Sequence, residues 1–571
     1  MLAGIASMGS KSSFVLEKKT VLEIDLTGVI NDRVEENPFD FLFGEVKAHG
    51  LNDILSAIKK AKKNDKIEGI YLKAGFLRTG PASAQQIRNE LRSFKESGKF
   101  IVAYGDNYSQ RAYYVSSVAD KVFMNPEGIF EFQGMSSSIQ FAKGLFEKLG
   151  IEWQVFKVGT FKSAVEPIIS DKMSEPNRLQ RSAYLNDIWS VMLKDISESR
   201  NIPVEKLNQY ADECMTFASS EVIRTNQLID SLVYRADMES YFKEKLNLTK
   251  DDDLKIADVN DIKSVPASKE KLNKDKIAVL YAEGEIIADE LNTIFNTGHT
   301  ITAKKYVKEI NKLKEDENIK AVVFRVNSPG GSAFASEQIH HAIKALNEVK
   351  PVVVSMGDYA ASGGYYISSP ARKIVAEPTT LTGSIGIFGL IPSGVQLSEK
   401  IGTTYDHVKT NKMSDFLGQT IELPLVSGVL ARPLNTDESA IFQAFVERGY
   451  NTFLTRCAEG RGKTKAEIDS IGQGRVWTGN QALSNGLVDE LGGIDKAIQI
   501  AAGLAEIENY SIREYPEQKD FFTQLMEESM KGAETRILSV FIGEEALKQK
   551  QMMKAWQTFD VKQAVTPVVI H

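Results

Sequence analysis

The sequence predicts an α/β protein made of two tandem copies of one unit, each a parallel-rich sheet with packed helices, followed by a helical C-terminal tail. Strand-like runs alternate with helical runs along most of the chain. One segment also occurs twice: YGDNYSQRAYYVSSVADKVFMNP (104–126) and MGDYAASGGYYISSPARKIVAEP (356–378) share 9 identities in 23 positions, without a gap, at an offset of 252. Self-similarity at a fixed offset indicates duplication.

The first copy is expected to span residues 17–263, and its elements follow from local patterns of apolar residues. Runs rich in β-branched residues predict strands, and apolar residues three and four positions apart predict helices. The strands are expected at 20–30, 67–74 and 100–105, and the helices at 51–63, 83–97 and 110–118.

The second copy is expected to span residues 277–510 and repeats this order. Its strands are expected at 277–286, 321–326 and 352–357, and its helices at 303–316, 336–348 and 363–369. Between the copies, residues 264–276 form a polar, Pro- and Lys-bearing stretch that predicts a linker. Residues 511–571 show amphipathic patterns, which predict the helical tail.

Length and composition are those of a folded protein with more than one domain. A chain of 571 residues is too long for one hydrophobic core, and its net charge of −7 gives no reason to expect a nucleic-acid partner. Cys214 and Cys457 cannot form a disulfide framework, and no zinc-type Cys/His spacing occurs, so we expect no metal and no cofactor. Residues 1–16 begin apolar but are too short to span a bilayer, and they fit either an ordinary chain end or the last turns of a membrane anchor.

A Ser-Gly-Gly tripeptide occurs in the second copy, where the first copy has none. At the offset of 252, Ser362 aligns with Gln110 and Gly363 aligns with Arg111. Ser362 precedes the helix expected at 363–369, and the positive end of a helix dipole favours a developing negative charge. A helix N-cap and a catalytic nucleophile both fit this position, and for the tripeptide alone the N-cap is the more common role.

A second glycine-bearing loop favours the nucleophile. The strand expected at 321–326 is followed by NSPGGS, in which Gly330 and Gly331 allow backbone N–H groups to point outward. Ligands of open α/β sheets bind at such strand ends. The first copy has FLRT (76–79) in place of SPGG, so both loops are lost from it together.

A serine nucleophile needs a base. His340 and His341 lie on an expected helix without an obvious carboxylate to orient them, so a Ser-His-Asp triad stays open but unsupported. A lysine can serve instead if burial keeps its amine neutral. Lys162, in VFKVGTFKSAVEPII, is flanked by apolar residues and fits that requirement.

Several motifs together resemble the signal peptide peptidase A (protease IV) family in its long, duplicated form. These motifs are NSPGGS, GDYAASGGYYIS, TGSIGIFG, GRVWTGNQALSNGLVDELGG and GTFKSAVEP. The resemblance covers residues 20 to 510 or so and implies a fold similar to the Clp protease and crotonase superfamily. The site residues that it implies are Ser362 and Lys162 as a catalytic dyad, Gly331 and Gly363 as an oxyanion hole, and Gly330 and Ser384 as substrate-binding residues.

Two assignments within this resemblance have alternatives. Lys412 aligns with Lys162 at an offset of 250, and single-copy members of the family take their lysine from the unit that carries the serine. We favour Lys162 because the stretch around Lys412 is more polar. Ser384 either positions the lysine amine through its hydroxyl or caps a turn.

The resemblance implies a membrane-associated serine endopeptidase that degrades signal peptides left after export and other extended apolar peptides. It further implies a homo-oligomer, with a tetramer favoured, anchored in the bacterial inner membrane with its catalytic body on the periplasmic, extracytoplasmic side. Two rival functions are a crotonase-type acyl-CoA enzyme without a serine nucleophile, and an inactive membrane scaffold in which Ser362 only caps its helix.

Overall fold

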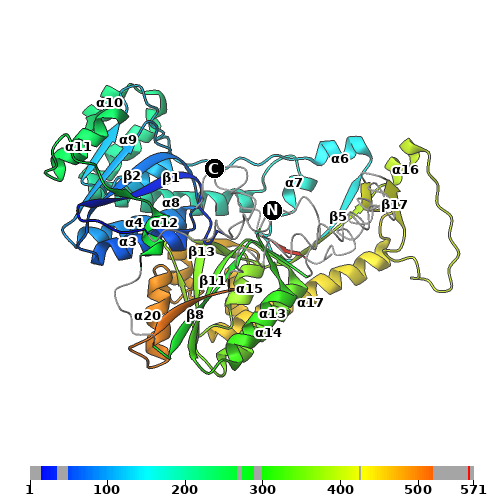
Figure 1. Ribbon diagram of the computed structural model, residues 1–571. Coiled ribbons are helices and arrows are strands. Elements are labelled where there is room, and N and C mark those ends of the chain that lie inside the picture. The colour runs from blue at the N-terminus through cyan, green and yellow to red at the C-terminus, as the bar shows by residue number, and fades with distance from the viewer. Residues whose placement is uncertain are drawn as a thin grey trace, which may run out of the picture. The chain divides into compact units, whose positions relative to one another are not determined.

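The computed structural model describes residues 14–34, 49–265, 273–288, 299–423, 426–517 and 563–565 (Figure 1). The chain divides into two compact units. Of the described residues, those before position 136 and those at 188–265 form unit 1, whereas residues 136–187 and those from 273 onward form unit 2. Residues 136–187, which belong in sequence to the first copy, therefore fold with the second copy.

Unit 1 is built on a six-stranded sheet in which all neighbouring strands run parallel, in the order β6-β4-β3-β2-β1-β7. Its strands are β1 (Thr20–Val29), β2 (Ile67–Arg78), β3 (Phe100–Gly105), β4 (Lys121–Met124), β6 (Ser231–Leu232) and β7 (Ile256–Ala257). Its helices are α3 (Leu51–Lys63), α4 (Pro81–Lys95), α5 (Gln110–Ser116), α9 (Val204–Asp212), α10 (Ser220–Thr225), α11 (Met238–Lys245) and α12 (Val259–Ser264), and α8 (Glu175–Arg200) contributes residues to both units.

The first sheet of unit 2 repeats this topology. It contains β8 (Lys276–Glu283), β11 (Ile319–Ser328), β13 (Val352–Ala361), β14 (Lys373–Ala376), β15 (Leu381–Gly383), β19 (Val476–Thr478), β20 (Glu490–Leu491) and β21 (Ser511–Tyr515). The pairings β20-β14-β13-β11-β8-β21 match β6-β4-β3-β2-β1-β7 strand for strand. The predicted duplicated α/β fold is therefore confirmed.

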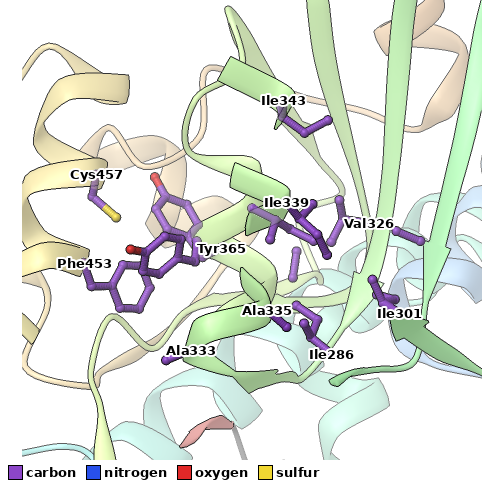
Figure 2. Close-up of a cluster of buried hydrophobic side chains, with 14 of the residues drawn as sticks. Ile286, Ile301, Val326, Ala333, Ala335, Ile339, Ile343, Tyr365, Phe453 and Cys457 are labelled. Carbon is purple, nitrogen blue, oxygen red and sulfur yellow. The ribbon is translucent and has the colours of Figure 1, made fainter. Parts of the chain in front are cut away.

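Helices cover both faces of this sheet (Figure 1). They are α13 (Ala303–Glu315), α14 (Ala333–Asn347), α15 (Gly363–Ser368), α17 (Thr436–Arg461), α18 (Lys465–Ile471), α19 (Gly479–Asn485) and α20 (Ile494–Leu504). α20 buries Ala497 and Ala501 against one face. On the other face Ile339 of α14 packs towards Val326 of β11, and Tyr365 of α15 packs towards Phe453 of α17 (Figure 2). This core holds β11 and β13, whose C-terminal ends carry both glycine-bearing loops.

A second, mixed sheet of unit 2 lies in the order β10-β9-β12-β22-β16-β18-β17, with β5 also paired to β16. Its strands are β5 (Glu152–Lys157), β9 (Glu285–Ile287), β10 (Thr300–Thr302), β12 (Gly330–Ser332), β16 (Phe388–Ser393), β17 (Thr420–Leu423), β18 (Val426–Leu430) and β22 (Gln563–Val565), and the short helices α6 (Lys143–Leu149), α7 (Glu166–Ile169) and α16 (Val395–Ile401) complete the unit. β5 runs antiparallel along the whole of β16, from Phe388↔Lys157 to Ser393↔Glu152. A strand of the first copy is thus built into the sheet of the second.

The structure differs from the sequence-based expectations at two places. The strand expected at 277–286 breaks at Gly284, whose φ is +104° and where a Cβ would lie 1.7 Å from the carbonyl oxygen of His299. Ser511–Tyr515, at the start of the expected helical tail, is the edge strand β21. Residues 1–13, 266–272 and nearly all of the remaining tail lie outside the described residues. Within the described parts of the chain, no helix combines the length and apolarity needed to cross a bilayer.

Candidate active site

Ser362 lies at the junction of β13 and α15 in a strained backbone conformation. Its φ is 55° and its ψ is −114°, and its side chain is fully buried. A non-glycine residue in such a region costs on the order of 1–3 kcal/mol, so its surroundings must hold it there. The Ser362 N–H donates a 2.8 Å hydrogen bond to the carbonyl oxygen of Gly383 in β15, which provides that restraint.

The side chain of Ser362 does not cap its helix. The first copy shows what an N-cap looks like at this junction: Ser109 precedes α5 with a φ of −68°, and its side chain accepts a hydrogen bond from the backbone N–H of Ala112. In unit 1 the aligned residue Gln110 instead exchanges hydrogen bonds with the backbone of Gln133 and Gly134. In the second copy the hydroxyl of Ser362 is therefore available for a contact other than helix capping.

That contact is the amine of Lys162, which lies in the loop between β5 and α7. Lys162 Nζ lies 2.8 Å from Ser362 Oγ, and it also lies 3.2 Å from Ser384 Oγ and 3.3 Å from the carbonyl oxygen of Ser384. All of these residues belong to unit 2. Because residues 136–187 of the first copy fold with the second copy, Lys162 lies next to a serine 200 positions later in the chain.

The Lys162 amine is desolvated. The residue is 1% exposed, and burial alone lowers its pKa to about 7. Two glycines make room for the side chain: a Cβ at Gly474 would lie 2.6 Å from Lys162 N, and a Cβ at Gly386 would lie 3.2 Å from Lys162 Cδ. An amine with a pKa near 7 is neutral in about half of the molecules at neutral pH.

A hydrogen-bonded frame fixes the lysine loop relative to the serine. The Phe161 N–H donates to the carbonyl oxygen of Gln473 (2.8 Å), and the Ser384 N–H donates to that of Arg475 (2.7 Å). Residues 473–475 therefore connect the lysine loop to the segment that follows β15. Because β15 also holds the backbone of Ser362, the frame joins Lys162 to Ser362 through main-chain hydrogen bonds.

Gln180 of α8 closes this frame, and sequence reasoning missed it. Its Nε2 donates to the carbonyl oxygen of Phe161 (3.0 Å) and to Ser163 Oγ (3.1 Å), while its Oε1 accepts from the Val476 N–H (3.1 Å). Gln180 thus hydrogen-bonds to the residues immediately before and after Lys162. One polar residue on a long helix carries no local signal for such a role.

The two glycine-bearing loops lie against each other. A Cβ at Gly363 would lie 3.1 Å from Gly331 N, and a Cβ at Gly331 would lie 2.0 Å from the carbonyl oxygen of Ile286, so neither position has room for a side chain. Gly363 is the first residue of α15, and the first N–H groups of a helix have no acceptor within it. The Gly330 N–H, in contrast, donates to Ser328 Oγ at 3.2 Å. The structure thus brings together all of the expected site residues around Ser362.

The alternative bases lie in other surroundings. Lys412 is on an exposed turn and pairs with Asp437, whose hydrogen bond raises the lysine pKa. His340 is buried with its ring edge-on to Tyr366, and burial lowers its pKa to about 4. Within the described ranges, no histidine hydrogen-bonds to Ser362.

Comparisons with known proteins agree with the duplicated architecture. The family model described as Peptidase family S49 matches residues 93–249 and again residues 344–508, and the Clp protease model matches residues 273–379. The chain is 35% identical to Protease 4 of Salmonella typhi, with 92% of this chain and 85% of that protein covered. It is 32% identical to the chloroplastic serine protease SPPA of Arabidopsis thaliana, with 86% and 70% covered. Among solved structures, a ClpP1 mutant from Listeria monocytogenes matches with a TM-score of 0.24 at 17% identity, covering 38% of this chain and 94% of that one.

Replacing Lys162 should stabilise the protein at neutral pH. The folded state depresses the lysine pKa, so the charged amine is penalised on folding, and Lys162→Met should raise the melting temperature of unit 2 at pH 7 by about 3–6 °C. Between pH 7 and the unfolded-state pKa near 10.5 the folded wild type binds fewer protons than the unfolded chain, so its stability rises with pH.

The advantage of Lys162→Met over the wild type should therefore shrink by about 2 kcal/mol between pH 7 and pH 9. Thermal unfolding at the two pH values measures this difference. Lys412→Met is the matched control and should give no gain, because Lys412 is exposed and paired. An advantage of Lys162→Met that is the same at both pH values would contradict a depressed lysine pKa.

Proposed function

Because this chain is a serine peptidase that belongs to peptidase family S49, we propose that it hydrolyses peptide bonds with Ser362 as the nucleophile and Lys162 as the general base. The observation that carries the proposal is the 2.8 Å separation between Lys162 Nζ and Ser362 Oγ. A base within hydrogen-bond reach of the nucleophile, with a pKa near the working pH, is what acyl transfer to serine requires.

The surroundings of Lys162 suit both of its protonation states. The neutral amine accepts the Ser362 proton as Oγ attacks the substrate carbonyl carbon. The resulting ammonium group has three N–H donors, and three oxygen atoms surround it: Ser362 Oγ, Ser384 Oγ and the carbonyl oxygen of Ser384. Ser384 thereby holds the lysine in place while the ammonium passes its proton to the leaving amine. In the second step Lys162 takes a proton from a water molecule, and this water attacks the acyl carbon and releases the acyl group from Ser362.

The backbone N–H groups of Gly331 and Gly363 stabilise the tetrahedral oxyanion in this mechanism. A Cβ would collide with Ser336 Oγ at Gly363 and with the carbonyl oxygen of Ile286 at Gly331, so glycine at both positions lets the two backbones lie close together next to Ser362. Preorganised donors of this kind are each worth about 10²–10³ in kcat.

The proposed substrates are signal peptides left after export and other extended apolar peptides. β12 and β16 flank the site, and strand edges bind an extended peptide through its main chain while side-chain pockets supply preference. Gly330 belongs to β12 and contributes to that edge.

We further propose that the enzyme is a membrane-associated homo-oligomer, with a tetramer favoured, on the periplasmic side of the bacterial inner membrane. The resemblance to the signal peptide peptidase A family implies this placement, and the Protease 4 relatives are bacterial. Protease accessibility in spheroplasts tests it: degradation of the protein only after lysis would contradict the extracytoplasmic side.

Substitutions in the dyad should abolish hydrolysis. We expect Ser362→Ala and Lys162→Met each to lower kcat/KM on a chromogenic peptide by 10⁴-fold or more, whereas Lys412→Met stays within about twofold of the wild type. A fluorophosphonate probe should label Ser362 in the wild type, which a crotonase-type enzyme would not allow. Hydrolysis that survives Ser362→Ala would refute the nucleophile, and loss of turnover in Lys412→Met alone would refute the base.

The pH dependence of hydrolysis should follow the lysine. Because only the neutral amine accepts a proton, kcat/KM should fall about tenfold per pH unit below pH 7 and reach a plateau above it. Initial rates at substrate concentrations well below KM, from pH 5 to pH 9, give this profile. An apparent pKa near 10 would mean that the amine is solvated, contrary to the structure.

A further inference from the structure

A segment from the far end of the chain is paired between the two strands that flank the candidate active site. β22 (Gln563–Val565) runs antiparallel to β12, with Gly330↔Val565, Gly331↔Ala564 and Ser332↔Gln563 as partners. It also runs antiparallel to β16, with Phe388↔Gln563 as partners. The sheet order β12-β22-β16 therefore places this segment next to the glycine proposed to bind the oxyanion.

The position of β22 is a slot one strand wide. Adjacent strands lie about 4.8 Å apart, so β12 and β16, on either side of β22, lie about 9.6 Å apart where it passes between them. Their outer edges are already occupied, because β9 pairs with β12 at Gly331 and β5 pairs with β16 along its length. The inner edges accept one extended chain, which is the shape of a peptide substrate.

The segment has the chemistry of a strand that such a slot can hold. Gln563, Ala564 and Val565 carry no charge and no proline, so each has a backbone N–H to donate to a neighbouring strand. The 45 residues from 518 to 562 separate it from the described end of unit 2 at position 517, so the tether is long enough to reach the site. Because the segment belongs to the same chain, its pairing in the slot is an intramolecular event.

We propose that residues 563–565 occupy the substrate position of their own active site and compete with incoming peptides. This inference rests on the proposed peptidase function, because only a peptidase would bind its substrate in this slot. The segment then acts as a tethered competitive inhibitor: it raises the apparent KM and leaves kcat unchanged, since a saturating peptide displaces it.

The first experiment detects the segment without using catalysis. Phe388→Cys and Gln563→Cys are introduced together into the full chain, with Ser362→Ala to prevent hydrolysis and Cys214→Ser to remove an exposed thiol. Directly opposed residues of an antiparallel pair lie within disulfide range, so mild oxidation should link the two cysteines within one chain. The control pair, Leu390→Cys with Gln563→Cys, is out of register, because Gln563 lies opposite Phe388 and Leu390 is two residues further along β16.

Mass spectrometry of the digested protein and non-reducing gels read the result. A disulfide within one chain for the Phe388 pair, and none for the Leu390 pair, supports the proposal. Absence of the Phe388 disulfide, equal yields from both pairs, or a disulfide between two chains would overturn it. This result stands whether or not the protein proves to be a peptidase, so failure of the segment and failure of the proposed function are distinguishable.

The second experiment measures competition and also covers the case in which Phe388→Cys impairs folding. Ala564→Pro removes a backbone N–H and should disrupt pairing of the segment. The KM for a chromogenic peptide should then fall about tenfold with kcat unchanged. Ile512→Thr, on the exposed edge strand β21, is the control and should change neither constant. An unchanged KM in Ala564→Pro would show that the segment does not compete.

Discussion

The whole candidate site depends on keeping one lysine amine out of water. An exposed lysine is protonated at neutral pH and has no lone pair to offer, as Lys412 illustrates through its pairing with Asp437. Lys162 escapes this state because its side chain is almost fully buried, with Gly474 and Gly386 packed close against it. Burial of this amine lowers the free energy of unfolding, and other interactions within unit 2 have to offset that loss.

The strained backbone of Ser362 is held in place by the strands and helices around it. Ser362 has a backbone conformation that a serine rarely adopts, and the glycines around it tolerate contacts that exclude any side chain. Such a junction persists because it lies at the ends of the buried strands β11 and β13, covered by helices on both faces. The first copy has the same strand order without the strained serine, which shows that the fold itself does not need it.

Sequence patterns predicted the elements well because each depends on neighbours in the chain. The duplicated strand order follows from alternating strand and helix signals, and the aligned loops identify Ser362 and Gly331 by their absence from the first copy. Lys162 was chosen from its apolar flanks and from a family resemblance. The structure brings it to Ser362, whereas its catalytic role stays a prediction.

Three features could not be predicted, because each depends on contacts between distant segments. Nothing in residues 152–157 indicates that β5 pairs with β16, more than 200 positions away. No sequence signal indicates that Gln180 hydrogen-bonds to both the lysine loop and Val476. The expected helical tail also contains β22, whose three residues acquire a strand conformation from the edges on either side of it.

The folding of residues 136–187 with the second copy has a consequence for biosynthesis. The lysine leaves the ribosome early, the serine follows 200 residues later, and the frame that joins them includes residues 473–475. A nascent chain that ends before this point already contains every strand of the unit 1 sheet but lacks the backbone that aligns the amine with the hydroxyl. The two atoms can meet only after residue 362 has been translated, and the frame around them is complete only after residue 475, so the candidate site forms late in synthesis.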